Sequence, residues 1–241
     1  MIEVHNLTFG YSSTEDGQIL KGVDFAAKTG KLTALIGTNG AGKSTLLKTI
    51  MGILKGKGEI SVNGKPVSQY STKDFSSTVS YLSQDNDCKV NLSVFEVVML
   101  GRMGSMSFRV SDEDIAATQE VLERLNLQRF ASRSIMELSG GQRQLVFMAQ
   151  ALVKEPKILI LDEPTSALDL HKQFDLLTLL KNLTQENDFT TLVTLHHLDL
   201  AAMFADEIIV LKEGTVYAQG APKNIFTEAM MEDVYRVKTK I

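Results

Sequence analysis

The sequence predicts an α/β protein with a mostly parallel sheet, a strand-rich N-terminal lobe and an inserted helical part. Three observations predict this class. After residue 140, segments with helical periodicity alternate with short apolar strands, an order typical of a parallel sheet covered by helices. The N-terminal third consists instead of short β segments separated by turn residues. A helical pattern between about Val94 and Phe130 separates these two regions.

Each expected strand of the N-terminal third is a short run of apolar and β-branched residues that ends near glycine or a polar turn. These runs cover residues 2–9, 23–27, 31–37, 58–64 and 79–83. The expected helical insertion contains the segments 94–103 and 111–127. Ser111, followed three residues later by Asp114, is a typical N-terminal cap for the second helical segment.

The C-terminal part of the chain continues this alternation. Helical patterns cover residues 141–153 and 171–186, and strand patterns cover residues 157–163, 190–196 and 207–214. Residues 224–241 are expected to form a short helix and a tail. The sequence shows no low-complexity segment, internal repeat or obvious linker, so we expect the helical part to be an insertion within one domain rather than a tethered module.

The composition is that of a globular protein that can bury a sizeable core. Of the 241 residues, 44% are hydrophobic and 22% are charged, and the mean hydropathy is 0.00. The formal net charge is −4, and Lys and Arg are spread along the chain. This charge distribution argues against a nucleic-acid-binding protein, which would carry a strong basic patch.

Neither a membrane span nor an export signal is expected. The longest apolar run, from Leu200 to Ala205, is far shorter than the roughly 20 residues that a membrane-spanning helix needs. The first residues lack the basic start and apolar core of a signal peptide. The single cysteine, Cys88, has no cysteine or histidine neighbours at metal-ligand spacing. We therefore expect a cytoplasmic protein in which Cys88 has a structural role.

The strongest local signal is the glycine-rich segment GTNGAGKST at residues 37–45. It follows an apolar strand, precedes a helix-compatible segment and satisfies the pattern GxxxxGK[ST]. Glycines let backbone N–H groups converge on phosphate oxygens, and the N-terminus of the following helix favours the anion. Lys43 would then contact the β- and γ-phosphates, and the Ser44 hydroxyl would ligate Mg²⁺. The alternative is a glycine-rich turn with a purely structural role.

Two acidic residues, Asp162 and Glu163, end the apolar segment ILILDE. Ligand-facing groups of an open parallel sheet emerge at the carboxyl ends of its strands, so we expect these carboxylates to complete the nucleotide site. Asp162 would belong to the Mg²⁺ shell, and Glu163 would accept a proton from the attacking water. Taken alone, such residues could equally be a solvated turn, and the glycine-rich segment is what favours the functional interpretation.

The segment LSGGQ at residues 138–142, here called the signature segment, begins an amphipathic helix between these two motifs. The adjacent glycines after Ser139 would expose backbone donors at a second helix N-terminus suited to phosphate. One nucleotide needs one glycine-rich cradle, so the second cradle suggests that the signature segment serves a nucleotide held by another copy of the chain. A plain helix cap and turn is the alternative.

With these motifs in this order, the chain resembles the ATPase subunits of the ATP-binding-cassette (ABC) family from Tyr11 to at least Leu200. The resemblance implies a P-loop NTPase core with a mostly parallel sheet, an N-terminal antiparallel β subdomain and an inserted α-helical subdomain. It implies a single ABC ATPase domain over residues 1–241. Residues 1–85 and 151–241 would form the nucleotide-binding core with the β subdomain, and residues 86–150 would form the helical subdomain that carries the signature segment.

The resemblance also implies roles for individual residues. The phosphate cradle would consist of Gly37, Asn39, Gly40, Ala41, Gly42, Lys43, Ser44 and Thr45. The contacts to the nucleotide of the second copy would come from Ser139, Gly140, Gly141 and Gln142. Tyr11 would stack on adenine, and Asp169 would lie at the junction between the two copies. Gln84 would join the Mg²⁺ and water shell and sense a membrane partner. Core packing for Tyr11 and a solvated loop position for Gln84 are the alternatives.

His196 ends the apolar strand, where its imidazole can donate to a γ-phosphate and orient both the water and Glu163. Relatives commonly end this strand in HDLN and this chain ends it in HHLD, so the register gives the role to His196 rather than His197. A structural histidine is the alternative. Three departures from the family pattern, at Thr38, Ser83 and Gln150, remove no phosphate or metal ligand but leave the hydrolysis rate open.

The predicted function is ATP hydrolysis, with ATP and Mg²⁺ as cofactors, by a homodimer that powers a membrane importer. The partners would be transmembrane permease subunits and, indirectly, an extracytoplasmic solute-binding protein, with the chain at the cytoplasmic face of the membrane. Residues 91–105 and 220–241 look like subunits that serve importers of iron chelates, haem and cobalamin. We expect iron-siderophore or haem import, and cobalamin or another metal chelate is the alternative. A soluble ABC ATPase outside transport and a regulatory module without turnover are the remaining classes.

Overall fold

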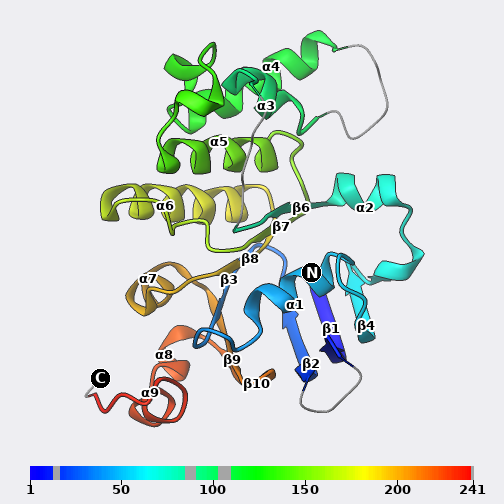
Figure 1. Cartoon of the computed structure of the whole chain (residues 1–241), viewed down its shortest axis with the longest axis vertical. Helices are drawn as coiled ribbons and strands as arrows, with labels where there is room; N and C mark the ends of the chain where they lie inside the picture. The colour runs from blue at the N-terminus through cyan, green and yellow to red at the C-terminus, as the bar shows by residue number, and fades with distance from the viewer. Residues whose placement is uncertain (13–16, 85–90, 103–109, 240–241) are drawn as a thin grey trace.

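The computed structural model describes residues 1–12, 17–84, 91–102 and 110–239. Its strands form two sheets, with α-helices between and around them (Figure 1). This arrangement confirms the predicted α/β class with a mostly parallel sheet and an N-terminal antiparallel sheet. Cys88 lies outside the described residues.

The larger sheet has the strand order β10-β9-β3-β8-β7-β6. Its members are β3 (Lys31–Ile36), β6 (Val79–Leu82), β7 (Ile158–Leu161), β8 (Thr190–Thr194), β9 (Glu207–Lys212) and β10 (Thr215–Gly220). The pairs from β9 across to β6 are parallel, and β10 pairs with β9 antiparallel. Strands β7 and β8 are buried at every position, as expected for a parallel sheet covered on both faces.

The smaller sheet has the order β2-β1-β4-β5, and its pairs are antiparallel. Its members are β1 (Ile2–Gly10), β2 (Gln18–Ala27), β4 (Lys57–Val62) and β5 (Lys65–Pro66). Helix α1 (Lys43–Ile50) lies between the two sheets (Figure 1). Its side chains Leu46, Leu47 and Ile50 are fully buried in one apolar cluster with residues of both sheets. This cluster therefore fixes the helix that follows the glycine-rich segment.

Helices α3, α4 and α5 lie together at one end of the molecule, next to α6 (Figure 1). They span α3 (Val94–Met99), α4 (Asp112–Arg124), α5 (Gly140–Leu152) and α6 (Leu170–Glu186). Their apolar side chains share one core cluster with residues on the face of the parallel sheet that is turned away from α1. The predicted cap is confirmed, because the Ser111 hydroxyl accepts from the Asp114 N–H and the Asp114 carboxylate accepts from the Ser111 N–H.

The remaining α-helices of the described residues are short. They are α2 (Thr72–Thr78), α7 (Leu198–Phe204), α8 (Pro222–Ile225) and α9 (Glu228–Tyr235). The expected C-terminal short helix is α9, and residues 236–239 follow it without helical structure. Helix α8 is separate from it, because Phe226 and Thr227 adopt non-helical backbone angles. None of the helices among the described residues has the length and apolar character needed to cross a membrane. The division of the chain at residues 86 and 150 stays a prediction.

Candidate active site

Five parallel strands end at the same edge of the sheet, and predicted site residues follow the ends of four of them. Leu35 of β3 is level with Thr194 of β8, and Leu161 of β7 is level with Leu82 of β6. The glycine-rich segment follows β3, Gln84 follows β6, Asp162 and Glu163 follow β7, and His196 follows β8. The parallel topology thus brings together residues that are more than 150 positions apart in the sequence.

A pocket of about 570 Å³ lies at this edge of the sheet. Of the described residues, it is lined by Ile19, Asn39, Gly40, Gly42, Lys43, Ser44, Thr45, Gln84, Glu163 and His196. Nine of these ten are residues that the sequence singled out for phosphate binding or catalysis. The pocket therefore combines the phosphate cradle with the three groups expected to handle the attacking water.

The loop that precedes α1, residues 37–42, needs glycine at both of its ends. Gly42 has φ +102° and forms the N-terminal cap of α1, a backbone conformation that L side chains rarely adopt. Gly37 has φ +150°, and a Cβ at that position would overlap the carbonyl oxygen of Leu211. Between them the loop turns tightly, with the Ala41 N–H donating to the Thr38 carbonyl oxygen at 3.2 Å. The loop thereby leads directly into the helix N-terminus.

Lys43 is folded back over the loop that it belongs to. Its Nζ donates to the carbonyl oxygens of Gly37 at 2.8 Å and Thr38 at 3.0 Å. Burial lowers the pKa of the Lys43 ammonium, and the nearby carboxylates of Glu163 and Asp162 act in the opposite direction. The side chain is thus a cation held close to the pocket by groups that a phosphate can replace.

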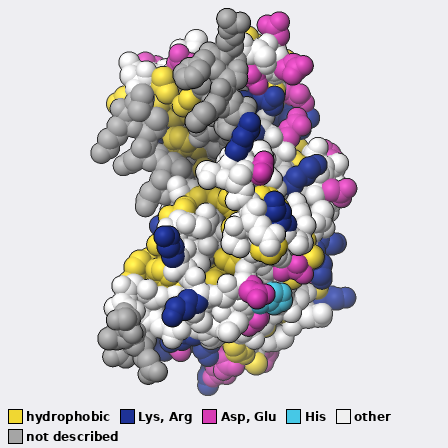
Figure 2. Space-filling view, turned by 90° about the vertical axis from the view of Figure 1, so that its right-hand side faces the viewer, with side chains coloured by type: hydrophobic (Ala, Val, Ile, Leu, Met, Phe, Trp, Pro, Cys, Tyr) yellow, Lys and Arg dark blue, Asp and Glu magenta, His cyan; other side chains and the backbone are white. Residues whose placement is uncertain are grey.

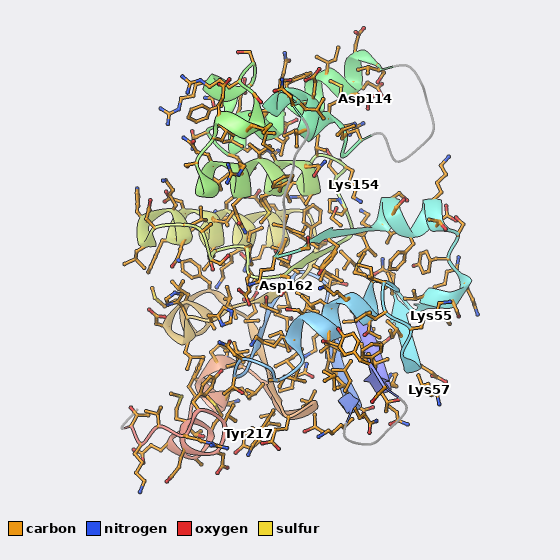
Figure 3. The ribbon with its side chains drawn as sticks, viewed as in Figure 1. Lys55, Lys57, Asp114, Lys154, Asp162 and Tyr217 are labelled. Atoms are coloured by element: carbon orange, nitrogen blue, oxygen red, sulfur yellow. The ribbon has the colours of Figure 1, made fainter. Side chains whose placement is uncertain are left out.

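Asp162 and Glu163 differ sharply in their surroundings. Asp162 is 1% exposed and lies near the centre of the molecule (Figure 3). Burial raises the pKa of Asp162, and hydrogen bonds from the hydroxyls of Ser44 and Thr194 oppose that rise. Glu163 follows in a left-handed backbone conformation with φ +51°, which turns its side chain toward the pocket. Two adjacent carboxylates can therefore take two separate roles.

Gln84 and His196 both contact the Glu163 carboxylate. Gln84 Nε2 donates to one carboxylate oxygen at 2.8 Å, and His196 Nε2 contacts the other. The His196 side chain is 39% exposed, so it borders both Glu163 and the open part of the pocket. His197 forms the N-terminal cap position of α7 and is exposed. This geometry supports the assignment of the predicted role to His196 rather than His197.

The signature segment lies at the N-terminus of α5 and is not among the described residues that line the pocket. The Ser139 hydroxyl accepts from the Gln142 N–H, and the Gln142 side chain accepts from the Ser139 N–H at 2.9 Å. Ser139 and Gly140 are exposed, while Gly141 and Gln142 are half-buried. The N-terminus of α5 is therefore formed and accessible, and it does not line the pocket of its own chain.

Tyr11 and Asp169 also lie outside the lining of the pocket among the described residues. The Tyr11 side chain is 70% exposed and packs edge to face on Phe9, with 5.0 Å between ring centroids. This exposure contradicts the core-packing alternative for Tyr11. Asp169 forms the N-terminal cap of α6, where its carboxylate accepts from the Lys172 N–H at 3.0 Å.

Sequence reasoning missed three residues at the site. Ile19 of β2 lines the pocket from the antiparallel sheet. Gln144 of α5 is buried, and its Nε2 donates to the Glu163 carbonyl oxygen at 3.3 Å. Thr194 contacts both Asp162 and Glu163. The available signal for Thr194 was a hydroxyl that follows two apolar residues and stands two positions before His196.

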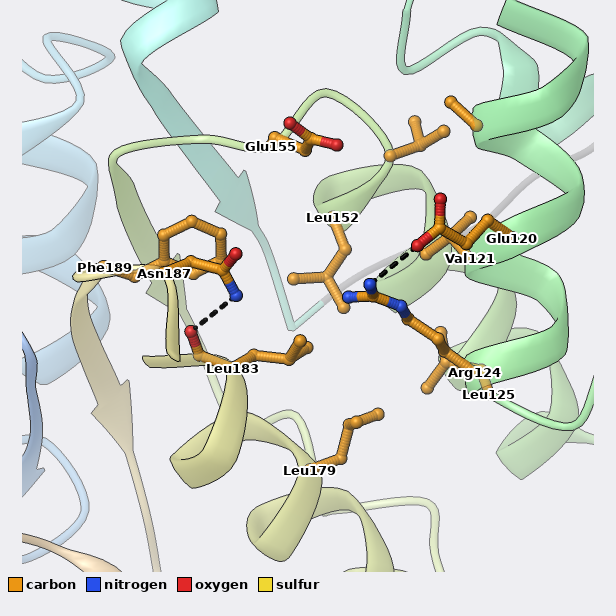
Figure 4. Close-up of a pocket in the computed structure, with 12 residues that line it drawn as sticks. Glu120, Val121, Arg124, Leu125, Leu152, Glu155, Leu179, Leu183, Asn187 and Phe189 are labelled. Atoms are coloured by element: carbon orange, nitrogen blue, oxygen red, sulfur yellow. Dashed lines mark hydrogen bonds and ion pairs between the residues drawn. The ribbon is translucent and has the colours of Figure 1, made fainter. Parts of the chain in front are cut away.

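A separate pocket of about 120 Å³ lies between α4, α5 and α6 (Figure 4). Three of its polar side chains are engaged locally: Arg124 pairs with Glu120 one turn earlier, and Asn187 donates to the Leu183 carbonyl oxygen at 3.0 Å. The rest of its lining is mostly apolar, as at Leu152. This pocket has no converging set of reactive groups among the residues described there, so it does not compete as an active site.

Comparison with known proteins agrees with this geometry. A family model described as ABC transporter matches residues 20–166. The iron(3+)-hydroxamate import ATP-binding protein FhuC of Bacillus subtilis is 37% identical, and the alignment covers 100% of this chain and 89% of that protein. The hemin import ATP-binding protein HmuV of Streptomyces coelicolor is 37% identical over 90% of this chain and 78% of its own length.

Among the similar solved structures, two examples match more than nine-tenths of the chain. One is an inward-facing transporter described as metal-chelate type, with a TM-score of 0.84, 30% identity and coverage of 98% of this chain and 89% of that one. The other is a dimeric ATP-binding cassette in a post-hydrolysis state bound to ADP and phosphate. It has a TM-score of 0.82 and 29% identity, and the match covers 92% of this chain and 99% of that one.

Proposed function

Because the chain belongs to the ABC transporter family, whose ATP-binding subunits hydrolyse ATP, we propose that it powers a membrane importer of metal chelates. The observation that best supports ATP hydrolysis is that Lys43, Glu163 and His196 line one pocket. The contacts of Gln84 and His196 with the Glu163 carboxylate add the arrangement expected around an attacking water. The function is thus ATP hydrolysis coupled to transport.

ATP binding rests on the loop between Gly37 and Lys43. The backbone N–H groups of the loop and the N-terminus of α1 receive the phosphates, and Lys43 leaves the carbonyl oxygens of Gly37 and Thr38 to contact the β- and γ-phosphates. Tyr11, exposed beyond the pocket, is available for stacking on the adenine. On nucleotide binding, the hydrogen bonds of Lys43 to the loop are therefore replaced by contacts with the phosphates.

Glu163 is the general base in this proposal. Its carboxylate accepts a proton as water attacks the γ-phosphate in line with the leaving oxygen. The contacts of His196 and Gln84 fix the carboxylate, and His196 also lies where it can donate to the γ-phosphate. Lys43 stabilises the negative charge that develops on the phosphate oxygens.

Mg²⁺ fits the donor set at this edge of the sheet. The Ser44 hydroxyl hydrogen bonds with the buried Asp162 carboxylate, and Gln84 lines the same pocket. A hydroxyl, a carboxylate and waters are the oxygen ligands that Mg²⁺ prefers, so Ser44, Asp162 and Gln84 would hold the ion. When bound, Mg²⁺ supplies charge neutralisation for the β- and γ-phosphates.

Two copies of the chain complete two sites in this proposal. The exposed N-terminus of α5 has no role in its own pocket, and Ser139 and Gly141 would contact the ATP held by the other copy. Asp169, at the exposed start of α6, would lie at the junction between copies. A dimeric cassette among the similar structures supports this arrangement. ATP then joins the two copies, and hydrolysis lets them separate.

A groove of about 380 Å³ is the proposed docking site for a permease subunit. It lies between α2 and β6 on one side and α3 and α5 on the other, and Lys154 borders it (Figure 3). Figure 2 shows apolar surface on this side of the molecule, with Lys and Arg side chains around it. Tyr81 and Leu82 line the groove two or three residues before Gln84, which contacts Glu163. A bound partner could thereby act on the catalytic carboxylate and place the chain at the cytoplasmic face of a membrane.

Iron-siderophore or haem complexes are the proposed cargo, because relatives that match this chain over most of its length carry those names. The test is to purify the chain with its membrane partners and measure transport of labelled ferric hydroxamate, ferric catecholate, haem and cobalamin. ATP-dependent accumulation of an iron complex, lost in the variant Lys43→Ala, is expected. Accumulation of cobalamin alone would move the proposal to that substrate. A chain that co-purifies with no membrane partner, or whose partners accumulate none of the four substrates, would contradict the importer assignment.

A further inference from the structure

Thr194 is the last residue of β8 and is fully buried. Its hydroxyl donates to Asp162 Oδ1 at 2.9 Å and accepts from the Glu163 backbone N–H at 2.7 Å. One side chain therefore bridges the two adjacent acidic residues of the pocket. The hydroxyl uses its one O–H donor for Asp162 and one of its two acceptor lone pairs for the Glu163 N–H.

The Glu163 N–H needs this partner because the chain leaves the sheet there. The preceding Asp162 N–H still donates to the Leu82 carbonyl oxygen at 2.8 Å and so continues the ladder with the neighbouring strand. Glu163 has φ +51°, a conformation that an L residue keeps only when its surroundings impose it. The Thr194 hydroxyl is one of the groups that impose it, since it anchors the N–H at the turn.

We propose that Thr194 is a positioning residue for ATP hydrolysis, holding the Asp162 carboxylate and the Glu163 backbone in fixed relation to each other. This inference rests on the proposed function, in which Glu163 is the general base and Asp162 belongs to the Mg²⁺ shell. Thr194 itself is not among the described residues that line the pocket. It acts through the two acidic residues that it contacts, Asp162 and Glu163.

Other buried threonines of the same sheet have different contacts. Thr191, in the same strand and also fully buried, pairs its hydroxyl with Thr184 of α6 at 2.6 Å and so fastens a helix to the sheet. The Thr33 hydroxyl in β3 has no hydrogen-bond partner among the described atoms. Burial of a threonine in this sheet is therefore not enough to place a hydroxyl on the acidic pair. Thr191 supplies a matched control for Thr194.

Thr194→Val keeps the shape of the side chain and removes the hydroxyl. It leaves the Asp162 carboxylate with one donor fewer and the Glu163 N–H without its acceptor. Loss of a group that orients a metal-binding carboxylate typically costs about 10- to 100-fold in activity or metal affinity. We expect kcat to fall by an amount in this range. The KM for ATP should change less than about 3-fold, because the phosphate cradle around Lys43 is untouched. Thr194→Ser restores the hydroxyl and should recover most of kcat.

The experiment compares wild type, Thr194→Val, Thr194→Ser, Thr191→Val and Glu163→Gln. Steady-state phosphate release gives kcat and KM, and urea unfolding gives the stability of each variant. Titration with a fluorescent ATP analogue supplies a second readout, the nucleotide affinity. Each protein is titrated once in the presence of EDTA and once in the presence of Mg²⁺. In EDTA all five proteins should bind alike, whereas the gain in affinity on adding Mg²⁺ should be smaller in Thr194→Val than in Thr191→Val. Thr191→Val should keep the wild-type kcat because Thr184 still donates to the Leu180 carbonyl oxygen.

The outcomes separate the two proposals. If Glu163→Gln hydrolyses ATP like wild type, the proposed general base is wrong, whatever Thr194 does. If Glu163→Gln is inactive while Thr194→Val keeps its kcat and its Mg²⁺-dependent gain in affinity, the positioning role of Thr194 is wrong and the proposed function stands. Equal losses of kcat in Thr194→Val and Thr191→Val, or no recovery in a stably folded Thr194→Ser, would overturn the positioning role as well.

Discussion

Replacing Gly37 with alanine tests how the glycine-rich loop is built. Gly37 has φ +150°, and the new Cβ would overlap the carbonyl oxygen of Leu211, a main-chain atom of β9. Gly40, three residues later, has φ +79° but no described atom within 4 Å of its Cβ position. Gly40→Ala therefore carries the conformational penalty alone, whereas Gly37→Ala carries that penalty together with a steric one. The pair separates the two costs within one loop.

The expected magnitudes follow from these two environments. A left-handed conformation costs an L residue about 1–2 kcal/mol, partly offset by about 0.4–1 kcal/mol from the stiffer unfolded chain, so Gly40→Ala should lose about 1 kcal/mol. Overpacking adds about 1–3 kcal/mol, which brings the expected loss for Gly37→Ala to about 2–4 kcal/mol. Strand β9 cannot retreat easily, because Leu211 belongs to a strand paired with both β3 and β10.

Urea unfolding followed by circular dichroism measures the free energy of unfolding of both variants, and titration with a fluorescent ATP analogue measures nucleotide affinity. Gly37→Ala should also bind nucleotide more weakly than Gly40→Ala, because displacement of Gly37 moves the carbonyl oxygen that holds Lys43. Equal unfolding free energies for the two variants, within about 0.5 kcal/mol, would refute the steric argument. In that case the loop would be free to move away from β9.

Two further perturbations probe a charge pair and a catalytic contact. The guanidinium of Arg102 and the Ser111 cap hold the pKa of Asp114 at about 2, below the ordinary 3.8. Its carboxylate therefore stabilises the fold above about pH 4 and loses this contribution as the pH falls toward 2. Asp114→Asn should lower Tm at pH 6 by more than at pH 3, and a Tm difference independent of pH would count against the pair. His196→Ala should lower kcat for phosphate release by about 10²-fold or more with little change in Tm, because its contact with Glu163 lies in an open pocket. An unchanged kcat would remove His196 from the catalytic set.

The sequence predicted the parts of the fold that depend on local pattern. The glycine-rich motif required a preceding strand and a following helix, and β3 and α1 are present in those places. Apolar strands that end in Glu163 and His196 predicted that these residues share one edge of the sheet, and the parallel register brings them into contact. Such predictions succeed because strand order and side-chain type are both visible along the chain.

The residues that the sequence did not reveal depend on contacts between distant segments. Ile19 reaches the pocket only because the antiparallel sheet packs on α1, and no local pattern sets that packing. Thr194 looks like an ordinary strand residue until β8 is placed beside β7. Helix α2 was missed because its seven residues hold little apolar periodicity. The roles of Tyr11 and the signature segment stay predictions, because both lie outside the pocket of the single chain.

In the proposed mechanism one chain holds half of each active site. The most direct test is the molar mass of Glu163→Gln in solution, measured by light scattering with and without ATP and Mg²⁺, with Lys43→Ala as the control that should not respond. Glu163→Gln should change from the 26.5 kDa of a single chain to twice that mass when ATP is present, because the nucleotide cannot be hydrolysed and holds two copies together. A Glu163→Gln protein that binds ATP fully and still has the mass of one chain would contradict it.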